Sequence, residues 1–135
     1  MELATNEHAS AKHLQENMKP MPIEVICYLS QQATEKSLKA VLFNQNKPVP
    51  TTHNINELLE LVNKNGIIIN LSQRDANRIT RFATRTRYAE TRIEASEKDA
   101  EYAVKTAGGV VKQAQEIISK GIDPTNTQNQ PTSKT

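Results

Sequence analysis

CYLSQQATEKSLKAV, the stretch from Cys27 to Val41, places glutamines, a glutamate and lysines inside what is otherwise the apolar centre of a helix. The apolar spacing predicts a helix from about residue 22 to about residue 45. Its apolar residues cover so much of the circumference that we expect it to be the most buried element. They are Ile23, Ile26, Cys27, Leu29, Ala33, Leu38, Val41 and Leu42.

Four other segments combine the helical period with residues that start or stop helices. A first helix is predicted over residues 3–18, where KPMP stops it. A short third helix starts near Asn54, a capping residue, and ends at Gly66. The capping-box patterns SQRD (72–75) and SEKD (96–99) open a fourth helix to about residue 89 and a fifth to Gly121. The β-branched run IIIN (67–70) has no strand partner, so we expect a packed loop.

These segments predict an all-α fold, an up-and-down antiparallel bundle of four main helices plus one short helix. The fifth helix carries an apolar seam for packing, formed by Ala100, Val104, Ala107, Val111, Ala114 and Ile118. A chain of 135 residues fits one domain, expected over residues 1–122. The remainder, residues 123–135, has no apolar side chain and is expected to be a disordered polar tail.

Composition indicates a cytoplasmic protein without membrane association. The single cysteine, Cys27, cannot form an internal disulfide, and we expect a buried thiol that fits a reducing compartment. No segment approaches the ~20 apolar residues of a membrane span, and the first residues do not resemble a secretion signal. A net charge of +2 is too small to predict nucleic-acid binding by itself, so any such signal must lie in the charge distribution.

The arginines are concentrated in one segment. All six fall between residues 74 and 92, where only Asp75 and Glu90 oppose them, which leaves a local charge of +4. At about 100° per residue, four of them share an arc of about 60° on the fourth helix, facing away from its apolar side. This stripe consists of Arg74, Arg78, Arg81 and Arg85. Guanidinium groups suit phosphates, but the stripe also fits a solvated face paired with neighbouring carboxylates, or a protein interface.

The polar residues of the second helix lie in two neighbouring rows, which also contain apolar residues. One row is Gln32, Lys36, Lys39 and Phe43, and the other is Gln31, Glu35, Leu38 and Leu42. Glu35 and Lys39 stand four apart in the favourable order, so a simple surface ion pair worth ~0.3 kcal/mol explains them.

On the fourth helix, Arg87 falls beside the apolar positions and needs a partner, for which Glu35, Glu57 or an anionic ligand would serve.

The stretch CYLSQQATEKSLKAVLFNQNKPVPTTHNINELLELV (27–62) resembles the signature of HEPN domains (higher eukaryotes and prokaryotes nucleotide-binding). It has a QQAxEKxxKA-type helix, a loop that closes in a Thr-His pair, and a Leu-rich helix. AKHLQENM (11–18) and TRYAE (86–90) are similar to the family's first helix and to its late Arg-Tyr, and the resemblance spans roughly residues 9–118. The matching residues are Gln32, Glu35, Lys36, Lys39, His53, Arg87 and Tyr88. Ala89 stands where a proline often follows.

The resemblance implies a single HEPN-like helical bundle, commonly a homodimer and often encoded beside a minimal nucleotidyltransferase in prokaryotic toxin–antitoxin pairs. Some members are metal-independent ribonucleases that use an Arg-x4-6-His motif, and others bind nucleotides without cleaving RNA. That motif is absent here, because every arginine lies at position 74 or later while the last histidine is His53. No phosphate-binding glycine loop, HExxH or CxxC occurs, so neither a metal nor a cofactor is expected.

The histidines leave alternatives open. His8 and His13 are expected to be exposed and not to be ligands, whereas His53 either helps to cap the third helix or lies beside an anion site.

We therefore expect a non-catalytic module that binds a nucleotide, an RNA phosphate backbone or a minimal nucleotidyltransferase partner. The alternative is a degenerate metal-independent ribonuclease. A homodimer is expected because the second helix and the seam of the fifth leave apolar surface to cover. The predicted binding residues are Lys36, Lys39, His53, Arg81, Arg85, Arg87 and Tyr88.

Overall fold

The computed structural model describes residues 1–87 and 95–120, and of residues 82–87 the backbone alone. The described chain forms five α-helices: α1 (Glu2–Asn17), α2 (Ile23–Asn44), α3 (Ile55–Lys64), α4 (Gln73–Arg87) and α5 (Glu97–Ser119). No strand occurs among these residues, and the predicted all-α class is confirmed. The polar tail predicted over residues 123–135 lies outside the described residues.

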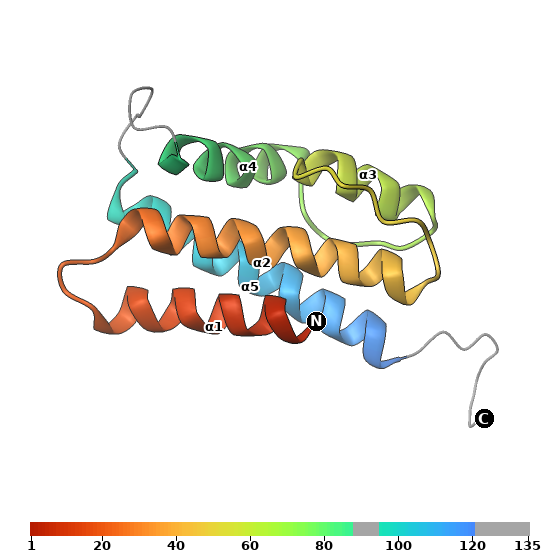
Figure 1. The fold of residues 1–135 in the computed structure, drawn as a ribbon, viewed down its shortest axis with the longest axis horizontal. Helices are drawn as coiled ribbons and strands as arrows, with labels where there is room; N and C mark the ends of the chain where they lie inside the picture. The colour runs from red at the N-terminus through yellow and green to blue at the C-terminus, as the bar shows by residue number, and fades with distance from the viewer. Residues whose placement is uncertain (88–94, 121–135) are drawn as a thin grey trace.

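Helix α2 is the centre of the bundle and contacts each of the other four helices. Helices α1 and α4 run in the opposite direction to α2 and α5, and the short α3 lies end to end with α4 along one side of α2 (Figure 1). The predicted arrangement of four main helices and one short one is therefore correct.

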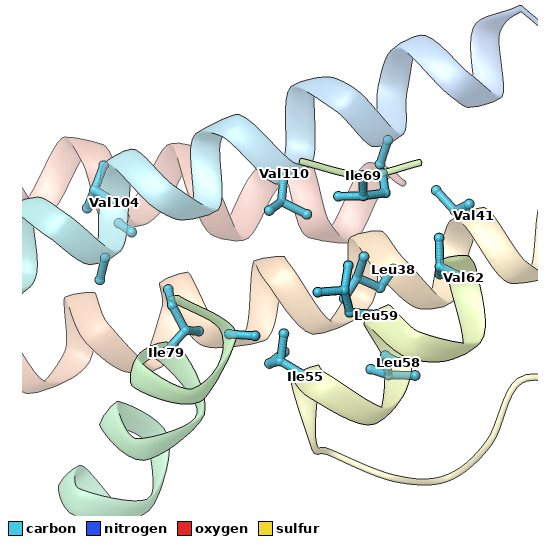
Figure 2. Packing of buried hydrophobic residues seen from close by; sticks show 14 of the residues in the cluster. Leu38, Val41, Ile55, Leu58, Leu59, Val62, Ile69, Ile79, Val104 and Val110 are labelled. Atoms are coloured by element: carbon cyan, nitrogen blue, oxygen red, sulfur yellow. The ribbon is translucent and has the colours of Figure 1, made fainter. Parts of the chain in front are cut away.

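The core forms where α2 meets α3, α4 and α5. Figure 2 shows Leu38 and Val41 of α2 together with Ile79 of α4, and with Leu59 and Val62 of α3. All five are at most 4% exposed. Because side chains of α3, α4 and α5 pack around α2, burial of apolar surface on α2 fixes the positions of these three helices.

Local signals in the sequence set the helix ends. Asn54 caps α3 by accepting a hydrogen bond from the Glu57 amide at 3.1 Å, and Ser96 and Asp99 form a full capping box at the start of α5. Gly66, at φ 83°, ends α3 in a Schellman motif, in which the Ile67 amide bonds to the Val62 carbonyl. These starts and stops match the prediction.

The run IIIN (67–70) is a packed loop, as predicted. Ile69 is 4% exposed and lies in the core near Val110, whereas Ile68 is 80% exposed (Figure 2). The side chain of Gln113 on α5 accepts from the Asn70 amide at 2.7 Å and donates to its carbonyl at 3.2 Å. A side-chain amide therefore satisfies the backbone groups that a neighbouring strand would otherwise bond.

Two sequence expectations about packing are wrong. His8 is not exposed, because its Nε2 bonds to the Val104 carbonyl at 3.2 Å and its ring packs against Gly108 of α5. The seam on α5 is not left uncovered either, since its members from Ala100 to Ala114 are buried within the single chain. The seam from Ala100 to Ala114 therefore provides no free surface for a second copy, whereas Ile118 at its end is partly exposed.

None of the helices in the described part of the chain combines the length and the apolar character needed to cross a bilayer.

Candidate functional site around Glu35 and His53

Glu35 lies in the middle of α2 and pairs with Lys39 as the spacing predicted, but its carboxylate is buried and not at the surface. Its exposure is 3%. Leu38 and Leu42 share its row on the helix and are fully buried, so the packing of that row carries Glu35 inward. A carboxylate in this position must be hydrogen-bonded, because an unpaired buried charge is strongly destabilising.

Three side chains surround this carboxylate. Gln31 Nε2 donates to Glu35 Oε1 at 3.2 Å, and Lys39 Nζ donates to Oε2 at 3.0 Å. His53, from the loop before α3, places its Nδ1 3.0 Å from the same Oε2. We refer to Gln31, Glu35, Lys39 and His53 as the Glu35 cluster.

These contacts keep Glu35 ionised. Burial alone would raise the pKa of its carboxyl, but hydrogen bonds from His53, Lys39 and Gln31, together with the Lys39 charge, lower the pKa below its ordinary value. An ionised carboxylate only accepts hydrogen bonds, so Nδ1 of His53 must be the donor in this pair.

The opposite edge of the His53 ring faces solvent. The side chain is 75% exposed although Nδ1 is held by Glu35, so the exposed part carries Nε2. Capping of α3 falls to Asn54, and the Asn54 amide is bonded to Thr52 Oγ1 at 3.1 Å. The His53 imidazole therefore serves the Glu35 cluster and not the helix cap.

The corner next to His53 is completed by α4. The Ile55 amide donates to Thr80 Oγ1 at 3.4 Å, and the side chains of Asn56 and Asn77 are hydrogen-bonded. Arg81 follows Asn77 by one helical turn on α4 and is exposed. These two contacts place the start of α3, which directly follows the exposed His53, against the part of α4 that carries the exposed Arg81. Asn77 and Thr80, the polar residues that alternate with the arginines of α4, were the sequence signal for the contact between α4 and the start of α3. This contact was not predicted.

Lys36 does not join this corner. It points to α1, where its Nζ lies 2.7 Å from Glu7 Oε2, and its side chain is 32% exposed. The one-residue offset from Glu35 turns Lys36 by about 100° around α2 and toward a different neighbour. A phosphate bound by Lys36, as the sequence predicted, would have to compete with the Glu7 carboxylate for its ammonium group.

Among the described side chains of the arginine stripe, Arg74 and Arg81 are exposed, whereas Arg78 is paired with α5. Arg78 donates to Asp99 Oδ1 at 2.9 Å and stacks over the Tyr102 ring at 3.8 Å, so it joins α4 to α5. The Tyr102 hydroxyl in turn bonds to Asp75. For Arg78 the interpretation as a structural pair is therefore the correct one. The side chains of Arg85, Arg87 and Tyr88, which were also predicted to bind phosphate, lie outside the described residues.

A shallow pocket of about 330 Å³ lies between the loop before α3 and the outer face of α3. It contains two carboxylates and one lysine, which is a poor setting for phosphate. Its lining residues are Pro50, Thr52, Glu57, Glu60, Leu61 and Lys64. Thr52 precedes His53 directly, so the pocket adjoins the Glu35 cluster without sharing its charges.

The described part of the chain is a helical module in which His53, before α3, and Arg81, on α4, are exposed. A family model described as the HEPN domain matches residues 2–118. The chain belongs to the HEPN domain family, and the resemblance seen in the sequence is confirmed. Comparison with curated proteins and with solved structures gave no match.

Proposed function

We propose that this protein is a non-catalytic HEPN module that binds the phosphate groups of a nucleotide or an RNA strand at the corner formed by His53, Lys39 and Arg81. Membership of the HEPN family supports a nucleotide- or RNA-related role. The observation that carries the proposal is the exposed imidazole of His53, fixed in orientation by the buried carboxylate of Glu35 at 3.0 Å.

A side chain held in this way is suited to binding because its orientation is set before the ligand arrives. The bond to Glu35 removes the rotational freedom that an exposed histidine otherwise has. Arg81 adds a charge that persists at every accessible pH, and Arg85 and Arg87 follow it along α4. The amides of Asn54, Ile55 and Glu57 are already bonded within the protein, so these three are not available to the ligand.

We further propose that the protein forms a homodimer and acts with a minimal nucleotidyltransferase as part of a prokaryotic toxin–antitoxin-like pair in the cytoplasm. The large apolar side chains of Phe43 and Ile68, 77% and 80% exposed, support a partner surface outside the bundle core. A molar mass that stays near 15.1 kDa in light scattering at micromolar concentration would reject the dimer.

Salt-dependent binding of labelled single-stranded RNA tests the central proposal. The affinity should fall steeply as salt rises, and Arg81→Ala combined with Arg85→Ala should reduce that dependence by roughly one unit of slope per lost phosphate contact. Lys105→Ala combined with Lys112→Ala is the matched control, since it also removes two exposed cations, both from α5. Equal effects of the double variant and the control would show that the corner is only a solvated surface.

One observation favours a second candidate, metal-independent RNA cleavage. An imidazole held at Nδ1 by a carboxylate and open at Nε2 is the arrangement of an oriented general base. His53 would accept the proton of a ribose 2′-hydroxyl as that oxygen bonds to phosphorus, and would return the proton to the departing 5′-oxygen. Arg81 would stabilise the negative charge on the phosphoryl oxygens. Gel analysis of the same RNA distinguishes the two candidates, because fragments that disappear with His53→Gln would establish the enzyme.

A further inference from the structure

The charge of the Glu35 cluster is set by the protonation state of His53. Lys39 and His53 share one acceptor, Glu35 Oε2, each at 3.0 Å. The carboxylate of Glu35 cancels the ammonium of Lys39, so with a neutral imidazole the cluster has no net charge. Lys39, which the sequence presents as a phosphate ligand, therefore contributes no uncompensated charge.

Protonation also reverses the hydrogen-bonding character of the exposed ring edge. Because Nδ1 donates to Glu35 in either state, Nε2 of the neutral ring holds a lone pair and is an acceptor. Phosphate oxygens are acceptors too, so the neutral ring offers them no bond. In the charged ring Nε2 becomes a donor, and its bond to a phosphate oxygen would be charge-assisted. The Nδ1 contact persists throughout, so no rearrangement is required.

We propose that His53 is a proton-dependent phosphate contact, which binds a phosphate oxygen of the ligand when the imidazole is charged and loses that contact as the pH rises. The inference rests on the proposed function, because it concerns the same corner. The ring contacts Glu35 of α2, which also binds Lys39, and the preceding residue, Thr52, bonds to Glu57 of α3. Helix α4, which packs against α3, carries the exposed charge of Arg81. Among the side-chain types present, histidine is the one that ordinarily changes charge between about pH 5 and pH 8.

A suitable probe is a short uridine-only RNA with a dye and no terminal phosphate. Its phosphodiesters keep the same charge between about pH 6 and about pH 8, whereas a terminal phosphate would itself titrate there. At constant ionic strength, we expect binding by the wild-type protein to be roughly tenfold tighter at the lower pH, the equivalent of one charge-assisted hydrogen bond.

Two variants separate His53 from other titrating groups. His53→Gln should lose most of this pH dependence, whereas His13→Gln should retain it, because His13 is exposed on α1 and bonded to Asn17. A third variant, Glu35→Gln, tests the charge balance by removing the negative charge of the cluster. Removal of the carboxylate releases the Lys39 charge, so binding at about pH 8 should become tighter than in the wild type.

The outcomes are distinct. Salt-dependent binding with the same pH dependence in wild type and His53→Gln overturns this inference and leaves the proposed function standing. A Glu35→Gln variant that keeps its helical circular dichroism and binds more weakly at about pH 8 also contradicts the charge balance. If the wild type binds RNA at neither pH, the proposed function fails and the inference fails with it.

Discussion

Glu35 Oε2 and His53 Nδ1 lie 3.0 Å apart although 18 positions separate them in the sequence. This contact attaches the proline-rich loop before α3 to the centre of α2. It also determines which edge of the imidazole faces solvent, so one interaction links the packing of the bundle to the chemistry of its surface.

Glu35→Ala should lower the free energy of unfolding by about 2 kcal/mol. The substitution leaves Gln31 and Lys39 without their acceptor, and loss of one partner in a buried pair costs more than the pair contributes. The estimate is reduced from that of a fully buried pair because the Lys39 and His53 side chains are 21% and 75% exposed. Urea unfolding followed by circular dichroism measures the change.

Glu60→Ala is the matched control for this prediction. Glu60 is an exposed glutamate on α3, so its removal should change stability by less than about 0.5 kcal/mol. Equal destabilisation by the two variants would mean that the Glu35 cluster contributes nothing specific to the fold.

Stability should decline in acid. The pKa of Glu35 is lowered by its hydrogen bonds despite burial, and the pKa of Asp99 is lowered first by the Ser96 amide and then, against burial, by Arg78. Both groups bind protons more weakly when folded than when unfolded. Their contribution is therefore complete above the ordinary values of 4.5 and 3.8 and is lost as the pH falls through the lower folded values.

The urea midpoint measured between neutral pH and about pH 3 tests this dependence. Glu35→Gln should flatten the part of the curve that belongs to Glu35, because glutamine does not titrate. A stability that rises on acidification below the ordinary carboxyl range would show the opposite sign and contradict the proposed pairing.

The two adjacent glycines of α5 should respond differently to alanine. A Cβ at Gly108 would lie 2.8 Å from His8 Nε2, whereas a Cβ at Gly109 would meet nothing within 4 Å. Gly109→Ala should stabilise the protein by about 0.5–1 kcal/mol through helix propensity. Gly108→Ala gains the same propensity but must displace an imidazole bonded to Val104, so it should be about 1 kcal/mol less stable than Gly109→Ala.

Thermal or urea unfolding compares the stabilities of Gly108→Ala and Gly109→Ala. As a control, both substitutions are repeated in a protein that also carries His8→Ala. Without the imidazole the difference between the two alanine variants should disappear. If it persists, the close approach of α1 and α5 at Gly108 is not its cause.

Cys27 should be inert in the native protein. Burial, followed by the charges of Asp99 and Glu24, raises the pKa of its thiol to about 12. A thiol reagent at about pH 8 should therefore modify Cys27 only when urea unfolds the chain, at a rate that follows the unfolded population. Rapid modification of the folded protein would place Cys27 at the surface and contradict the packing of α2.

The sequence predicted the five helices because their signals are local. Apolar spacing, the Asn54 cap, the Ser96 capping box and Gly66 each act within one or two turns, so neighbouring residues contain the information. The core followed for the same reason, since a helix that is apolar around most of its circumference has to lie at the centre.

The site was predicted less completely because its contacts join distant segments. The burial of Glu35 depends on how the loop and α3 close over α2, and the bond to His53 depends on that closure as well. Likewise, the orientation of Arg78 toward Asp99 depends on the register of α4 against α5. The spacing predicted the pair of Lys39 with Glu35 within α2, whereas the pair of Lys36 with Glu7 joins two helices and was not predicted.

The most direct measurement of the central claim is an NMR titration of the imidazole resonances with a mononucleotide. The chain has three histidines, and His53→Gln assigns the relevant signals. His8, bonded to Val104, and His13, on the outer surface of α1, are internal controls. We predict that the His53 ring signals shift in a saturable manner while those of His8 and His13 stay in place. Binding that leaves the His53 signals unchanged, or moves all three histidines alike, would contradict a phosphate site at this corner.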